Sequence, residues 1–197
     1  MNIALAIVGA YIVGSFDFAV VVARMRGVDI REVGSGNPGT SNVLRTLGRG
    51  PAAMVLIGDT LKGFMGGFMG MLGAGVADPL VHWAFAAGLA AVIGHCYPIF
   101  HRFRGGRGVA TGLGVLFFTL PLLGLGVLIG WIILAKVTKV AAIASLAAVL
   151  VTVPLAWYLG VRGLAFLWFA LIVALIIFRH RANIGRMLKG SEQKVTR

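Results

Sequence analysis

The stretch 109–135, VATGLGVLFFTLPLLGLGVLIGWIILA, decides how this chain is arranged. It is apolar over 27 residues and is interrupted by Pro121, Gly124 and Gly126. A helix that spans a bilayer needs about 20 apolar residues. The stretch therefore has two interpretations: one long helix, or a hairpin of two short helices that turns near 121–126. Each arm of the hairpin would be only about 20 Å long, so the arms would need a thinned or protein-lined part of the membrane.

The rest of the chain has the same apolar character. Hydrophobic residues make up 59% of it and charged residues 12%, whereas soluble proteins are about 45–50% apolar and about 25% charged. These values predict an all-α integral membrane protein with a single domain over 1–197. No basic region precedes the first run and no small-residue cleavage site follows it, so we expect that run to stay as a helix. The other long apolar runs are 2–22, 51–76, 79–100, 140–160 and 163–178.

The positive charges favour the hairpin. Lysines and arginines near the ends of membrane helices prefer the cytoplasmic side. One long helix would put the basic patch 136–139 and the basic tail from Arg179 on the face opposite the earlier arginines. The hairpin instead gathers all 18 lysines and arginines on one face except Lys62 and Arg162. It predicts seven transmembrane helices, some of them short, with the N-terminus outside and the C-terminus and active-site loops in the cytoplasm.

Composition also restricts the partners. The net charge of +12 lies in short patches between apolar runs, which favours membrane lipid and anionic substrates over nucleic acid. The single Cys96 excludes a disulfide within the chain and any multi-cysteine metal site. Only six residues are acidic, so we expect neither a metal nor another cofactor. No acidic residue lies five positions after any histidine, which excludes the HxxxxD acyltransferase dyad, and the Asp-rich motif of the CDP-alcohol phosphotransferases is absent.

The first polar patch is GSGNPGTSN at 34–42, followed by Arg45. Its three glycines let the backbone turn and bring N–H groups close to a ligand. Residues 40–48 could begin a helix whose N-terminus faces an anion, and the Arg45 guanidinium suits phosphate. The alternative is a flexible loop rich in turn-forming residues. The candidate binding residues are Ser35, Gly36, Asn37, Thr40, Asn42 and Arg45.

The second patch, RGGRG at 104–108, leads directly into the apolar stretch. It again predicts backbone amides and cations at a helix N-terminus, although it does not match the P-loop pattern. The alternative is an ordinary basic loop with glycines for a tight turn. The nearby His95 is as compatible with a core position as with a chemical role. The candidate binding residues are Arg104, Gly105, Gly106, Arg107 and Gly108.

The third patch is RHRANIGR at 179–186. His180 and Asn183 would share a face if the helix continued through them, and the adjacent arginines favour a neutral His180, which suits a base or a neutral donor. The alternative is a lipid-facing basic helix end. Asp59 and Lys62, three apart within an apolar run, form either a structural ion pair or part of a site. Asp17 is either protonated or paired across helices.

These three patches, in this order, resemble the motifs of the bacterial acyl-phosphate:glycerol-3-phosphate acyltransferases, the PlsY family. The resemblance covers nearly the whole chain. It implies an enzyme of the bacterial inner membrane that transfers a fatty acyl group from acyl phosphate to the sn-1 hydroxyl of glycerol 3-phosphate, giving lysophosphatidic acid and phosphate. The chain departs from the family pattern at Arg104 and Arg107, where lysine is usual, and at Asp17, where proline is common. A serine expected just after 136–139 is replaced by Ala141 or Ala142, although Ser145 is close by.

On this resemblance, we expect the protein mainly to position an already activated donor and to stabilise charge. Arg104, Gly105, Gly106 and Ser35 would hold one phosphate. Arg45, Asn37 and Asn183 would hold the other or orient the hydroxyl. His180 is the candidate base, with a phosphate oxygen of the substrate as the alternative, so that His180, Asn183 and Ser35 form the candidate catalytic set. A membrane transporter for an anionic, phosphate-bearing metabolite is the rival interpretation.

Overall fold

The computed structural model describes residues 2–74 and 81–195, and its regular secondary structure there is entirely helical. This confirms the predicted fold class. The predicted ends at 76 and 79 lie outside the described residues. The helices are α1 (Ile3–Gly14), α2 (Phe18–Arg24), α3 (Thr40–Leu47), α4 (Arg49–Ala74), α5 (Val81–Cys96), a 3-10 turn (Ile99–His101), α6 (Val109–Thr119), α7 (Pro121–Thr138), α8 (Ala141–Tyr158), α9 (Gly163–Arg179) and α10 (Arg181–Leu188).

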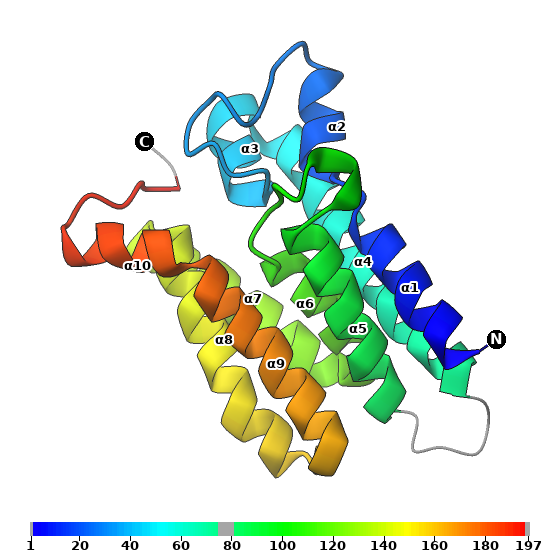
Figure 1. The fold of residues 1–197 in the computed structure, drawn as a ribbon. Coiled ribbons are helices and arrows are strands. Elements are labelled where there is room, and N and C mark those ends of the chain that lie inside the picture. Colours follow the sequence, from blue (N-terminus) through cyan, green and yellow to red (C-terminus); the bar gives the residue numbers. More distant parts are fainter. Residues whose placement is uncertain (1, 75–80, 196–197) are drawn as a thin grey trace.

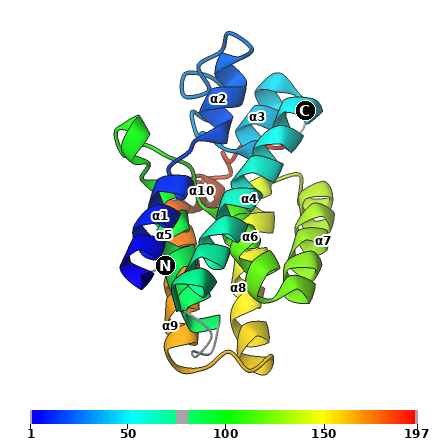
Figure 2. The same ribbon diagram turned by 90° about the vertical axis from the view of Figure 1, so that its right-hand side faces the viewer.

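The hairpin predicted within 109–135 is present (Figures 1 and 2). The helix breaks at Leu120, and Pro121 takes the first position of α7, where its missing N–H costs nothing. Because α7 returns, the basic patches meet at one end of the bundle. Arg31 donates to the Arg104 carbonyl, Arg179 donates to the carbonyls of the second patch, and the Val195 N–H donates to the Lys139 carbonyl at 2.7 Å.

The segment expected as a helix over 2–22 is one candidate membrane span, Ile3–Arg24, but its helix is interrupted between α1 and α2. Asp17 caps α2 by accepting a hydrogen bond from the Val20 N–H at 3.2 Å. Lys62 Nζ donates to the Phe16 carbonyl, which the break leaves without a helical partner, at 2.8 Å. Asp17 also pairs with Arg31 at 3.3 Å. The buried Asp17 carboxylate thus has two partners where the helix stops. Of the two alternatives for Asp17, pairing is the one found, although its partner Arg31 lies in a loop and not on a helix.

By length and composition, four helical segments of the described chain could cross a membrane, or five if the bent pair α9–α10 counts as one span. The segment Ile3–Arg24 counts as one of these despite its break. Helix α6 is shorter, and α4 carries Asp59, Lys62 and many glycines within its 26 residues. Helices lie over all seven predicted segments, but the number seven for the spans stays a prediction.

Small residues let α4 approach its neighbours closely. A Cβ on Gly63 would lie 1.9 Å from the Thr111 carbonyl oxygen, and one on Gly114 would lie 1.9 Å from that of Thr60. Within a bilayer, helices gain no hydrophobic free energy by associating, because the lipid tails are as apolar as the side chains. Close packing of this kind therefore drives their association. Helix α4 thereby fixes α6, and the second patch at its start, against the rest of the bundle.

Candidate active site

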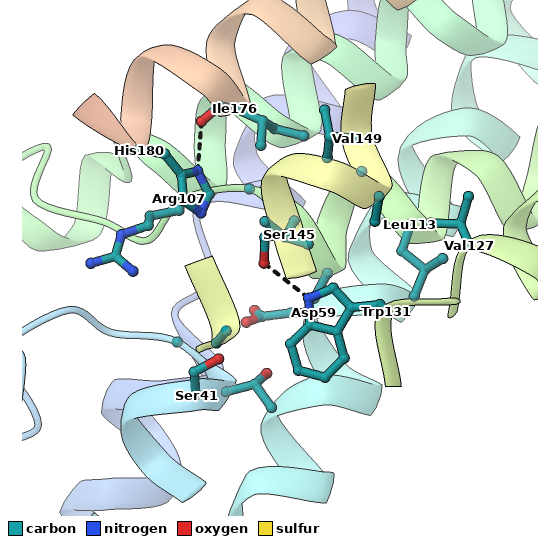
Figure 3. Close-up of a pocket in the computed structure, with 18 of the residues that line it drawn as sticks. Ser41, Asp59, Arg107, Leu113, Val127, Trp131, Ser145, Val149, Ile176 and His180 are labelled. Carbon is teal, nitrogen blue, oxygen red and sulfur yellow. Dashed lines mark hydrogen bonds between the residues drawn. The ribbon is translucent and has the colours of Figure 1, made fainter. Parts of the chain in front are cut away.

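A pocket opens at the end of the bundle where the basic patches meet. Its empty volume, which includes open space at the mouth, is about 1280 Å³. The mouth is polar and takes residues from the first patch, from 107–110 and from His180. Figure 3 shows Arg107 and His180 near each other on one side of the pocket, with Leu113 and Val127 on the other. The interior is apolar and is lined by side chains of α6, α7, α8 and α9. The pocket therefore suits a molecule with an anionic head and an apolar tail.

Two helices begin at the mouth. Helix α3 starts at Thr40 and α6 at Val109, and neither has a side chain that caps its first turn. The first N–H groups of a helix lack partners within the helix and carry partial positive charge. Gly39 and Gly108, which precede these helices, both line the pocket. The expected helix starts after both glycine patches are present, and together they offer two places for an anion.

The first patch is held in shape by Asn42. Its Oδ1 accepts from the Ser35 N–H at 2.9 Å, and its Nδ2 donates to the carbonyls of Ile30 and Val33. All its side-chain polar atoms are thus engaged within the protein, although the residue lines the pocket. Arg45 Nη2 donates to Ser35 Oγ at 3.2 Å. Asn37 and Thr40 also line the pocket, whereas Gly36, with φ of +68°, serves the turn and does not.

The second patch divides into two parts. The N–H groups of Gly105 and Gly106 donate to the carbonyls of Cys96 and His95, and their own carbonyls accept from Arg179 at 2.8 and 3.0 Å. These glycines therefore fasten the loop and do not line the pocket. Arg104 is exposed and lies outside the pocket as well. Only Arg107 and Gly108, of the five candidates here, line it.

In the third patch the helix does not run straight on. Helices α9 and α10 meet at a 50° bend, with His180 at the break. His180 is buried and lines the pocket, and its Nδ1 lies 2.8 Å from the Ile176 carbonyl oxygen. Asn183 is buried but does not line the pocket, and it donates to Glu192 Oε1 at 2.7 Å. The helix therefore does not continue through both residues, and only His180 lines the pocket.

The protonation state of the His180 ring follows from its surroundings. Burial, and then the charges of Arg107 and Arg179, lower its pKa to about 4, although the Ile176 carbonyl acts in the opposite sense. The ring is neutral at pH 7. Because a carbonyl oxygen can only accept, Nδ1 carries the proton and Nε2 has the free lone pair. The expectation of a neutral His180 therefore agrees with its environment, with burial as the larger cause.

Arg45 and Arg107 give the mouth positive charge without a direct ion pair. Neither forms an ion pair with a carboxylate among residues 2–74 and 81–195. Burial lowers the pKa of Arg45 and lowers that of Arg107 to about 10. The charge of Glu192 raises both pKa values and that of Arg186 lowers both. Both guanidiniums remain charged at pH 7. The Thr40 hydroxyl and Arg45 Nε are buried without a hydrogen-bond partner, so the mouth has donors left for a ligand.

Comparison with known proteins agrees with this geometry. A family model described as glycerol-3-phosphate acyltransferase matches residues 4–190. This chain belongs to the glycerol-3-phosphate acyltransferase family. The glycerol-3-phosphate acyltransferase of Rubrobacter xylanophilus is 42% identical, covering 98% of this chain and 95% of the relative. The glycerol-3-phosphate acyltransferase of Thioalkalivibrio sulfidiphilus is 43% identical, covering 96% of this chain and 92% of the relative.

Solved structures agree with the family assignment. The glycerol 3-phosphate form of PlsY, an integral membrane glycerol 3-phosphate acyltransferase, matches with a TM-score of 0.90 and 36% identity. The match covers 98% of this chain and 94% of that one. The lysophosphatidic acid form matches with a TM-score of 0.88 and 35% identity. This member of the acyltransferase family is accordingly an integral membrane protein.

Several residues of this acyltransferase pocket were named in the sequence analysis only as alternatives, or not at all. Asp59 and His95 both line it, and Ser145 accepts from Trp131 Nε1 at 2.9 Å across α7 and α8 (Figure 3). An acidic residue inside an apolar run was a usable signal for Asp59. Trp131 gave none, because an aromatic residue in an apolar run is equally suited to lipid. In the part of the chain that the structure describes, no three His, Cys, Asp or Glu side chains gather as a metal site would require.

Proposed function

We propose that the chain transfers a fatty acyl group from acyl phosphate to the sn-1 hydroxyl of glycerol 3-phosphate. One observation carries the proposal: two uncapped helix N-termini and two unpaired arginines line the polar mouth of a pocket whose interior is apolar. Both substrates carry a phosphate and one carries a long acyl chain. Two anion sites beside one apolar channel match that pair of molecules, and the products would be lysophosphatidic acid and phosphate.

The heads and the tail are assigned by charge and polarity. Arg107 and the start of α6 would bind one phosphate, and Arg45, Ser35 and the start of α3 the other. The acyl chain would lie among the apolar side chains of α6–α9. Gly36, Asn42, Gly105 and Gly106 would shape the two loops, since their contacts are made within the protein. Arg104 would then act only through its charge near the mouth.

The attacking hydroxyl must lose a proton. Its oxygen forms the new ester bond to the acyl carbon, the bond from that carbon to the phosphate oxygen breaks, and phosphate leaves. His180 is a weak base, because the pKa of its conjugate acid is about 4. We therefore assign the proton to a phosphate oxygen of the substrate, while Nε2 of His180 accepts a hydrogen bond from the hydroxyl and orients it. Asn183 would support the bend from behind through Glu192.

The same proposal includes the topology. The basic patches at the pocket end favour the cytoplasmic side of the bacterial inner membrane, with the C-terminus there and the N-terminus outside. Seven helices would cross or enter the bilayer, with α6 and α7 as a hairpin in which only α6 is short. A cysteine placed at Leu159, between α8 and α9, should react with a membrane-impermeant thiol reagent applied outside intact cells. A cysteine at Arg104 should not react, and the reverse labelling would refute this orientation.

The activity is tested on purified protein in detergent with palmitoyl phosphate and glycerol 3-phosphate. Phosphate release should require both substrates and exceed the uncatalysed rate. Arg45→Gln and Arg107→Gln should each lower kcat/KM by about 10-fold or more, because a hydrogen bond to a charged group is worth about 1.5–3 kcal/mol. Arg26→Gln, an exposed arginine of the same basic face, is the control. Release no faster than without protein would refute the proposal.

A further inference from the structure

His95 lies where the two glycine patches meet. A Cβ on Gly106 would lie 2.2 Å from His95 Nε2 and 2.7 Å from the Pro38 carbonyl oxygen. Gly106 is therefore held between the imidazole on one side and the first patch on the other, and only a residue without a side chain fits there. The Gly106 N–H also donates to the His95 carbonyl at 3.0 Å. The position of the imidazole thus bears directly on the spacing of the two patches.

The imidazole itself lies next to a buried carboxylate. His95 Nδ1 lies 3.6 Å from Asp59 Oδ1, and Lys62 Nζ lies 2.7 Å from the same oxygen. His95, Asp59 and Lys62 are only 8%, 2% and 3% exposed, respectively. Lys62 already balances the charge of Asp59, so the ion pair needs no histidine. His95 and Asp59 both line the pocket, whereas Lys62 does not.

We propose that Asp59 and His95 form a positioning pair that sets the distance between the two anion sites. Asp59 fixes the ring, the ring fixes Gly106, and Gly106 leads directly to Arg107. The first patch, in contact with the other side of Gly106, carries Arg45. The inference rests on the proposed function, because the anion sites have a purpose only if two phosphate-bearing substrates react there. A displacement of about 1 Å in such a constellation can lower a rate by about 10²-fold.

A double-mutant cycle tests the proposal. His95→Ala removes the ring, His95→Phe keeps a ring but loses the contact with Asp59, and each is combined with Arg107→Gln. If His95 acts by placing Arg107, His95→Ala lowers kcat/KM by about 10²-fold in the wild-type background and by less than about 3-fold in the Arg107→Gln background. His95→Phe should recover part of the loss. His101→Ala, a histidine outside the pocket, is the matched control and should be nearly silent in both backgrounds.

The outcomes separate the two proposals. If wild-type protein releases no phosphate, the proposed function fails and this inference fails with it. If wild-type protein is active but the losses at His95 and Arg107 multiply, only the positioning pair is refuted. Thermal unfolding in detergent identifies a variant that loses activity because it does not fold. If His95→Ala does not fold, the same cycle with His95→Phe in its place tests the positioning pair. Asp59→Asn should add less than about 3-fold to the loss in His95→Ala, because Asp59 acts through the ring.

Discussion

The protonation of His180 gives the sharpest prediction. Its pKa of about 4 in the folded protein compares with an ordinary value of 6.5. At pH 5, only about a tenth of the molecules would carry a charged ring, whereas an unperturbed histidine would be almost fully charged. If neutral His180 orients the hydroxyl, its contribution to catalysis should be nearly constant between pH 8 and pH 5.

The assay compares kcat/KM for wild type and His180→Asn at each pH. Taking the ratio cancels the titration of glycerol 3-phosphate itself, whose phosphate has a pKa near 6 by analogy with other phosphate monoesters. The ratio should stay within about 2-fold, since a pKa of about 4 leaves about 90% of the rings neutral at pH 5. A ratio that falls about 10-fold between pH 7.5 and pH 5.5 would assign an ordinary pKa to His180 and refute the reasoning from burial.

The same shift affects stability with a definite sign. Between pH 6.5 and pH 4 the unfolded chain binds a proton at His180 that the folded chain does not, so the free energy of unfolding falls as the pH is lowered through this range. A shift from 6.5 to about 4 corresponds to at most about 3 kcal/mol. The melting temperature of wild type in detergent should therefore fall more steeply over this range than that of His180→Asn. Equal slopes would contradict the prediction.

Two further predictions concern packing. Gly114→Ala should destabilise the protein by about 1–3 kcal/mol, because the new Cβ would lie 1.9 Å from the Thr60 carbonyl oxygen. The control is Gly126→Ala, whose new Cβ would meet nothing within 4 Å. Equal melting temperatures for the two variants would refute the close approach of Gly114 to Thr60. Phe169 packs on Phe85 at the inner end of the pocket, with ring centroids 5.4 Å apart. Phe169→Ala should shift the preference toward longer acyl phosphates, by about 4-fold in affinity for each extra buried CH₂, and an unchanged chain-length profile would remove Phe169 as the end of the channel.

The sequence allowed the topology to be predicted where charge and helix breakers agree. Pro121 offers a place to turn, and the lysines at 136–139 require the chain to return to the basic face, so the α6–α7 hairpin follows from two independent signals. The interruption at Asp17 could not be predicted in the same way. An acid in an apolar run is equally consistent with protonation, pairing or capping, and only the position of the Val20 N–H decides for capping.

The site was predicted as a region more accurately than as individual contacts. Glycine patches next to helix starts indicate where N–H groups will be free, and both uncapped helices were found there. The pattern does not say which N–H groups are used internally. Those of Gly105 and Gly106 bond to the end of α5, a contact that depends on how the loop folds back. The 50° bend at His180 is a similar case, because α10 is directed by contacts such as that between Asn183 and Glu192.

The distribution of acids explains why the mouth remains positive. Each carboxylate that is buried or half-buried in the described chain already has a basic partner: Asp17 with Arg31, Asp59 with Lys62, and Glu192 with Arg186. The other two described acids, Asp29 and Glu32, are exposed. Among residues 2–74 and 81–195, no carboxylate forms an ion pair with Arg45 or Arg107. Their half-buried guanidiniums can therefore pair with an anion that enters the pocket. With so few acids in the chain, Arg45 and Arg107 stay available for the two phosphates of the proposed reaction.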